Sequence, residues 1–172
     1  MNFSIPEIIS RLVAPRHKLS CSWWLWRRLT RELRLRGKGT RESGAFLLGR
    51  VDASGRRRII DYVLYDELDP EALSTGIVRL DGRHFGRLWE LCESLSLTVV
   101  ADVHTHPGGV GQSQSDQEHP IIARADHIAL IIPCFAEPPV TRDKVGIYRY
   151  LGAKRWQGIL SHERRLFFHI GL

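Results

Sequence analysis

Apolar residues recur at helical spacing in two long stretches of the chain. The first covers about residues 20–37, with Ser20 or Ser22 as its candidate N-cap and Gly37 at its end. The apolar stripe of this helix, which we expect to pack in the core, consists of Trp23, Trp26, Leu29 and Leu33. A second helix is predicted from about residue 82 to 96, with an apolar face made of Phe85, Leu88, Trp89, Cys92 and Leu95. Two shorter helices are predicted, over residues 5–13 and from about Ser113.

Short apolar runs between these helices are typical of strands. The turn residues from Asp52 to Gly55 join the first two of them. The predicted strands cover residues 42–51, 57–65, 76–80, 97–104, 127–133 and 144–151, with a last strand or hairpin from residue 154. Strands interleaved with helices predict an α/β fold, in which helices sandwich a mixed β-sheet.

The composition is typical of a globular protein. Of the 172 residues, 43% are hydrophobic and 26% are charged, and this length fits one domain. Apolar runs are far shorter than the ~20 residues that cross a bilayer, and the first residues lack the pattern of a secretory signal. The three cysteines are widely separated and form no Cys-x-x-Cys pair, so we expect reduced, mostly buried thiols and a cytoplasmic protein without a membrane partner.

Positive charge is concentrated in the first third of the chain. Residues 11–58 contain fourteen lysines and arginines against three acidic residues, while the net charge of the whole chain is +6. A basic segment of this kind can contact nucleic acid, an acidic membrane or an acidic protein partner. It is also compatible with a solvated, arginine-rich helix face.

One segment combines metal-ligating side chains with a tight turn. His104 and His106 end a predicted strand, where residues two apart point to the same face. Pro107 and two glycines turn the chain, and Asp116 follows ten residues after His106. Two histidines, one carboxylate and a water form a catalytic zinc site, whereas a structural site has four protein ligands. The histidines without such spacing, expected to be ordinary residues, are His17, His84, His119, His127, His162 and His169.

Other metal-binding families also use a His-x-His pair. Metallo-β-lactamase-like enzymes need His-x-His-x-Asp-His, but residues 108 and 109 are both glycine here. Cupins need a glutamate three or four residues after the second histidine, and none is present. Amidohydrolase barrels need far more than 172 residues. This comparison leaves a small zinc hydrolase.

The same segment resembles the JAMM (MPN+) motif, which is His-x-His-Pro followed by Ser-x-x-Asp. His104, His106, Ser113 and Asp116 occupy the positions of this motif. Upstream, residues 42–49 (ESGAFLLG) look like the Glu-x-x-Gly-x-Leu-x-Gly segment of that family. The resemblance covers about residues 20–160. It implies a JAMM/MPN-type, cytidine-deaminase-like fold, with residues 1–19 as an N-terminal segment and 20–172 as a single catalytic domain.

The resemblance also implies a role for each motif residue. His104, His106 and Asp116 would hold Zn²⁺, and Glu42 would act as general acid and base. Without the resemblance to this family, Glu42 would be interpreted as a surface carboxylate at the start of a strand. Ser113 would donate a hydrogen bond to the oxyanion. Two departures bear on this serine. The gap after His106 is one residue shorter than usual, and Gln112 replaces a common proline, so Ser115 is the alternative donor.

JAMM proteins with a full ligand set commonly cleave bonds after the C-terminal glycine of ubiquitin or a ubiquitin-like protein. The compact chain looks like stand-alone prokaryotic members, among them deconjugating isopeptidases of bacterial anti-phage and ubiquitin-like operons. The resemblance therefore implies a zinc isopeptidase or peptidase. Its substrate would be a ubiquitin-like conjugate, and E1-like and E2-like enzymes from the same operon would be its partners.

Two rival functions stay open at this stage. RadC-type proteins share a His-x-His-Pro-x-Gly run and are associated with nucleic acid, which the basic residues 11–58 slightly favour. Against this reading, the charge is not accompanied by a helix-turn-helix or RNA-binding motif, so we expect no strong nucleic-acid partner. The second rival is a non-catalytic MPN scaffold that binds partners through the tryptophan-rich helix.

Overall fold

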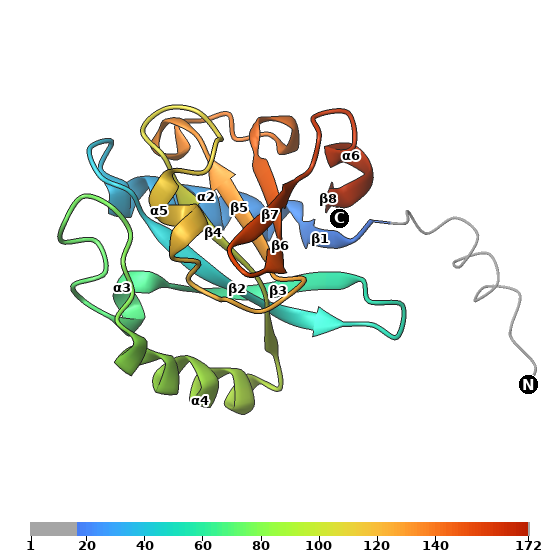
Figure 1. Cartoon of the computed structure of the whole chain (residues 1–172), viewed down its shortest axis with the longest axis horizontal. Coiled ribbons are helices and arrows are strands. Elements are labelled where there is room, and N and C mark those ends of the chain that lie inside the picture. The colour runs from blue at the N-terminus through green and yellow to red at the C-terminus, as the bar shows by residue number, and fades with distance from the viewer. Residues whose placement is uncertain (1–16, 172) are drawn as a thin grey trace, which may run out of the picture.

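The structure, a computed structural model, describes residues 17–171. Strands and helices alternate along the chain, as the sequence predicts (Figure 1). The strands are β1 (Leu19–Ser22), β2 (Gly44–Val51), β3 (Arg57–Leu64), β4 (Thr98–Thr105), β5 (Ile128–Ile132), β6 (Gly146–Gly152), β7 (Arg155–Gly158) and β8 (Phe168–Gly171). The α-helices are α2 (Trp23–Gly37), α3 (Tyr65–Leu68), α4 (Phe85–Leu95), α5 (Gln114–Glu118) and α6 (Arg164–Phe167). Three 3₁₀ turns cover Gly82–His84, Cys134–Ala136 and Arg142–Lys144.

All eight strands belong to one curled, mixed sheet in the order β7-β6-β5-β4-β2-β3-β1-β8. The centre of the sheet is the antiparallel pair β2 and β4, and β5 runs parallel to β4 on its other side. At one edge, β1 pairs in parallel with both β3 and β8. The strand that carries the histidines is therefore an interior strand, bonded on both sides.

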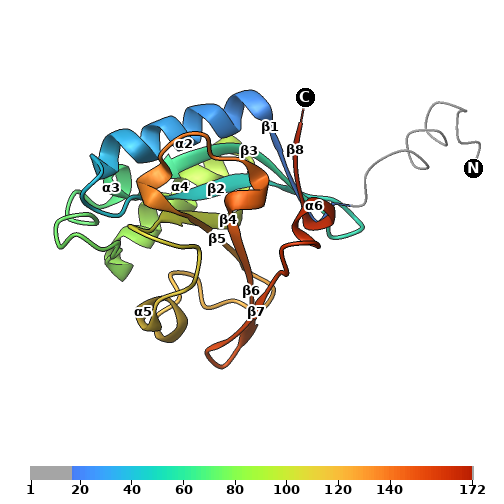
Figure 2. The same cartoon turned by 90° about the horizontal axis from the view of Figure 1, so that it is seen from above.

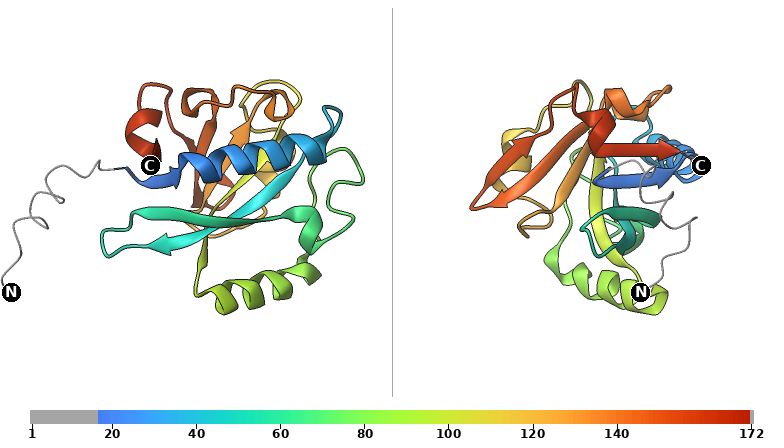
Figure 3. Two further views of the ribbon diagram at one scale, coloured as in Figure 1. Left: turned by 180° about the vertical axis from the view of Figure 1, so that it is seen from behind. Right: turned by 90° about the vertical axis from the view of Figure 1, so that its right-hand side faces the viewer.

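Helices cover both faces of this sheet (Figure 3). α2 packs on one face, against residues such as Leu47, Val103 and Leu130, and its own Leu29 and Leu33 are fully buried there. α4 covers the other face, where Leu88 packs with the second hydrophobic cluster. Successive residues of a strand point to opposite faces, so one buried strand contributes to both layers.

Local sequence signals account for the boundaries of α2. The Ser22 hydroxyl accepts a hydrogen bond from the backbone N–H of Leu25, which identifies Ser22 rather than Ser20 as the N-cap. Lys38 ends the helix in the left-handed conformation. The predicted core stripe is correct for Trp26, Leu29 and Leu33. It is wrong for Trp23, which begins the helix and is 41% exposed.

Several local predictions differ from the structure. Residues 76–80 form no strand but an irregular segment, because their polar backbone groups bond to neighbouring loops and side chains. The short elements β1, β8, α3 and α6 were not predicted, and Leu19, assigned to the N-terminal segment, is buried in β1. Of the three cysteines, Cys134 is exposed. The helix predicted over 5–13 lies outside the described residues. Across residues 17–171, the helices lack the length and apolar character that spanning a membrane requires.

Candidate metal centre

β4 and the residue that follows it present three titratable side chains on one face. Val103 packs in the core beneath α2, so by alternation Asp102, His104 and His106 point to the opposite face. His104 and His106 are almost completely buried, with relative exposures of 6% and 8%. The sequence prediction that both imidazoles share a face is confirmed.

Backbone hydrogen bonds on both sides fix the end of β4. The His106 N–H donates to the carbonyl of Ile132, and the His106 carbonyl accepts from the N–H of Phe135. On the other side, Ser43 and Thr105 exchange backbone and side-chain hydrogen bonds, and Ser43 Oγ also donates to the Leu33 carbonyl. The histidines are thereby attached to β2, β5 and α2 at once, which limits their movement.

α5 brings the carboxylate back to the histidines. Ser113 is its N-cap, and its Oγ accepts from the Asp116 N–H at 3.1 Å. In return, the Ser113 N–H donates to Asp116 Oδ2 at 2.7 Å. This capping box holds the backbone and the side chain of Asp116 in one orientation. The loop and the short helix after His106 agree with the sequence prediction.

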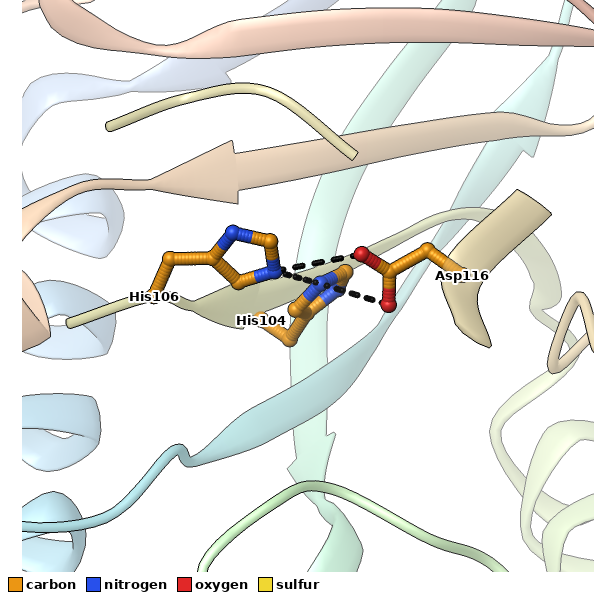
Figure 4. Close-up of side chains that lie close together, drawn as sticks. All are labelled: His104, His106 and Asp116. Atoms are coloured by element: carbon orange, nitrogen blue, oxygen red, sulfur yellow. Dashed lines mark hydrogen bonds and ion pairs between the residues drawn. The ribbon is translucent and has the colours of Figure 1, made fainter. Parts of the chain in front are cut away.

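The three side chains converge on one point (Figure 4). The Nε2 atoms of His104 and His106 are 2.9 Å apart. Asp116 Oδ1 lies 3.4 Å from His104 Nε2, and Oδ2 lies 3.2 Å from His106 Nε2. Bonds of 2.0–2.1 Å to a tetrahedral ion place two ligand atoms about 3.3 Å apart. The two imidazole nitrogens and the nearest carboxylate oxygens therefore have spacings close to those of ligands around one divalent metal ion.

The charges in this cluster favour an ionised carboxylate. Burial raises the pKa of Asp116, but hydrogen bonds from His104 and His106 and from the Ser113 N–H outweigh it, so the net pKa is well below its ordinary value. Burial lowers the pKa of His104, but the hydrogen bond and charge of Asp116 outweigh it and give a net increase. A cation, whether a proton or a metal ion, is therefore stabilised between these groups.

Glu42 lies beside the same cluster. Its Oε1 is 3.8 Å from His106 Nε2, and its Oε2 accepts from the Val78 N–H at 3.2 Å. The backbone N–H of Glu42 donates to the Gly76 carbonyl. The segment 76–78 thus holds the carboxylate at the edge of the cluster, although it is not the predicted strand. One carboxylate oxygen faces His106, and the other is fixed by the backbone.

The glycines of the segment 42–49 are required by close packing. A Cβ on Gly44 would lie 2.3 Å from the Tyr65 ring and 2.9 Å from the Val103 carbonyl. A Cβ on Gly49 would lie 1.9 Å from the Arg58 carbonyl, at a register shift between β2 and β3. Both positions exclude any side chain. The two glycines of the segment 42–49 are therefore required by the packing of β2, independently of the role of Glu42.

The two candidate serines occupy different places. Ser113 Oγ takes part in the capping box with Asp116. Ser115 lines a small cavity beside the cluster, together with His104, Asp116 and Trp156. Both serines are exposed. The geometry thus gives Ser113 a positioning contact with Asp116, and it leaves either hydroxyl available as a donor.

A buried polar network next to His104 was missed by the sequence prediction. His127 Nε2 and Asp102 Oδ1 are 2.5 Å apart, and the Tyr65 hydroxyl donates to Asp102 Oδ2 at 3.2 Å. All three residues are at most 4% exposed. The signal available in the sequence was Asp102 itself, a charge in an apolar strand two residues before His104. His127 is not one of the three clustered ligand residues, but through Asp102 it belongs to the buried surroundings of His104, a place that its position near the site in the sequence also allows.

Comparisons with known proteins support part of this picture. No family model matches the chain. A protein of Sinorhizobium fredii named as a probable metalloprotease is 29% identical over 65 residues, which are 38% of this chain. The match spans 40% of that relative, well under half of its length. Over this stretch the chain is similar to a protein named as a probable metalloprotease.

Solved structures share the fold at low sequence identity. A protein from Desulfitobacterium hafniense superposes with a TM-score of 0.61 at 16% identity, over 82% of this chain and 89% of that one. A protein from Salinibacter ruber gives a TM-score of 0.51 at 16% identity, over 77% and 86% of the two chains. At this identity the likeness concerns the fold alone. The His-His-Asp cluster is a possible site for a divalent metal ion.

Proposed function

We propose that the protein is a zinc-dependent isopeptidase or peptidase of the JAMM type. The observation that carries this proposal is the convergence of His104, His106 and Asp116, with Glu42 within 3.8 Å of His106. Three protein ligands leave one position of a tetrahedral ion for water or substrate, as in catalytic zinc sites. Two imidazoles and one carboxylate suit zinc better than magnesium or calcium, which prefer all-oxygen ligands.

Each polar group has a defined part in hydrolysis. When bound, zinc lowers the pKa of its water towards ~7 and polarises the scissile carbonyl. Glu42, at the edge of the cluster, accepts the proton of the attacking water and passes it to the leaving amine. Ser113 donates to the oxyanion and also orients Asp116 through the capping box, with Ser115 as the alternative donor. His104 and His106 would hold the ion through their Nε2 atoms, together with Asp116.

The proposed substrate is the C-terminal tail of a ubiquitin-like protein joined to an amine. Val78 and Ser115 lie at the small cavity next to the cluster, where bulky side chains beside the scissile bond would clash. A glycine-ended tail in an extended conformation meets this constraint. Activating and conjugating enzymes of the E1 and E2 type are the partners that such a substrate requires, in the bacterial cytoplasm.

This proposal is tested by mapping products. The zinc-loaded protein is incubated with a conjugate of its operon's ubiquitin-like protein and with unrelated peptides, and the products are identified by mass spectrometry. We expect one cut, directly after the C-terminal residue of the modifier, and no cut with Glu42→Gln. Cleavage inside the folded modifier, or an intact cognate conjugate with the zinc-loaded protein, would contradict the proposal.

A further inference from the structure

A wide groove runs along α2, away from the metal centre. It has a volume of about 1040 Å³ and lies between α2 and the segment 136–143. Figure 2 shows this segment, in orange, next to the helix. The groove lies on the α2 side of the sheet, whereas His104 and His106 point to the other side. Whatever binds in it is therefore separate from the reaction at the cluster.

One wall and the entrance of the groove are apolar. Pro138, Pro139 and Val140 line it opposite the helix. Trp23 and Trp24 line its other end and are 41% and 70% exposed. Exposed tryptophans and arginines are the residue types that dominate binding energy at protein interfaces. Trp26 also lines the groove, but it is buried, and its ring N–H donates to the Val140 carbonyl and fixes the wall in place.

The helix side of the groove carries positive charge. Its lining contains five arginines, four of them on α2, against one carboxylate, that of Asp143. Arg27 stacks over the Trp23 ring at 4.6 Å. Arg28 and Arg34 pair with Asp61 and Glu137, but these pairs are largely exposed to solvent. Exposed ion pairs contribute little to the stability of the fold. Their arginines can therefore exchange these partners for the carboxylates of a bound protein.

We propose that this groove binds an acidic, amphipathic segment of a partner protein. From Trp23 to Arg34 the helix is about 17 Å long, which matches three turns of a bound helix or about five residues of an extended segment. Apolar side chains of the segment would pack on Trp24 and on the proline wall, and its carboxylates would face the α2 arginines.

Other occupants fit the groove less well. A second copy of this chain would bring two arginine-rich helices together, and the net charge of +6 opposes that contact. Single-stranded nucleic acid would stack on the tryptophans, but the wall made of Pro138, Pro139 and Val140 presents aliphatic surface, which suits apolar side chains rather than a phosphate backbone.

The test is a selection from a displayed library of random 12-residue peptides against the intact protein. Enriched peptides are synthesised with a fluorescent label, and their dissociation constants are measured by anisotropy. We expect the selected peptides to combine Asp or Glu with aliphatic or aromatic residues. Trp24→Ala and the double variant Arg27→Ala/Arg31→Ala should each weaken binding at least tenfold. The loss of affinity in the arginine variant should be larger at low salt, because salt screens the charge interactions that it removes.

Matched controls lie outside the groove. Trp89→Ala removes another half-exposed tryptophan, and Arg58→Ala removes another exposed arginine, so both should bind the peptides like the unchanged protein. His104→Ala should also bind them, which separates this proposal from the proposed hydrolase function. Selected peptides without acidic enrichment, or peptide binding unchanged in the groove variants, would overturn the proposal.

Two further results would assign the groove to another occupant. A 12-nucleotide single strand that binds more tightly than any peptide, and no longer binds the groove variants, would indicate nucleic acid. A dimer in sedimentation that Trp24→Glu dissociates would indicate self-association.

Discussion

Glu42 is a residue whose removal separates catalysis from folding. It is close to His106 but is not one of the three converging ligands. We therefore expect Glu42→Gln to keep normal metal content and thermal stability, while kcat falls at least ~10²-fold through the loss of the general base. Glu71→Gln, in the loop after α3, is the control and should leave kcat unchanged. Near-normal turnover by Glu42→Gln would remove this residue from the mechanism.

Ser113 and Ser115 can be distinguished by comparing stability with activity. Ser113→Ala removes the N-cap of α5 and one contact with Asp116, so it should cost about 1 kcal/mol of stability and weaken metal binding. If Ser113 is also the oxyanion donor, kcat at saturating metal should fall on the order of 10²-fold. Thermal unfolding, metal titration and kinetics measure the three effects. A larger loss of kcat in Ser115→Ala would assign the donor to Ser115.

The ligand residues were predictable from the sequence, but their surroundings were not. Strand alternation places His104 and His106 on one face, and the capping signal at Ser113 predicts where Asp116 returns. The contact between Asp102 and His127 joins β4 to the residue just before β5, 25 positions further along the chain. That contact depends on the pairing of β4 with β5, and sequence spacing alone does not determine this pairing.

At the level of elements, β2 is fitted closely against its neighbours at Gly44. A methyl group there would collide with the Tyr65 ring, whose hydroxyl bonds to Asp102 next to His104. We expect Gly44→Ala to lower the free energy of unfolding by about 1–3 kcal/mol through overpacking. Gly86→Ala is the matched control, because nothing lies within 4 Å of its Cβ position on α4. It should be neutral or stabilise by up to about 1 kcal/mol. Equal stability of the two variants in urea denaturation would contradict this packing argument.

Elements with strong periodicity were predictable, and short ones were not. α2 and α4 have long amphipathic patterns, and α2 also has a serine N-cap, so their positions follow from the sequence. β1 and β8 are four residues each and exist because they pair with one another across the chain. Trp23 has the right spacing for the core, but it lies in the first turn of α2 and lines the groove along this helix, where it is 41% exposed.

For the whole molecule, a rise in pH should strengthen metal binding and lower the stability of the metal-free protein. The neighbouring Asp116 raises the pKa of His104 above its ordinary value of about 6.5, so a proton competes with the metal already above that pH. In metal-free protein, the stability contributed by protonated His104 is complete below pH ~6.5 and is lost as the pH rises through the folded-state pKa. The increase in melting temperature on adding zinc should therefore be larger at pH 8 than at pH 6. An increase that does not depend on pH would contradict the proposed competition.

The most direct test of the central claim is the metal content of the purified protein. The unchanged protein, His104→Ala, Asp116→Ala and the control His162→Ala are prepared without chelators. Their zinc content is measured by inductively coupled plasma mass spectrometry. The structure brings three ligands to one point, so we expect about one equivalent of zinc in the unchanged protein and in the control, and little in the two ligand variants. Full zinc content in both ligand variants would show that the zinc is held at another site.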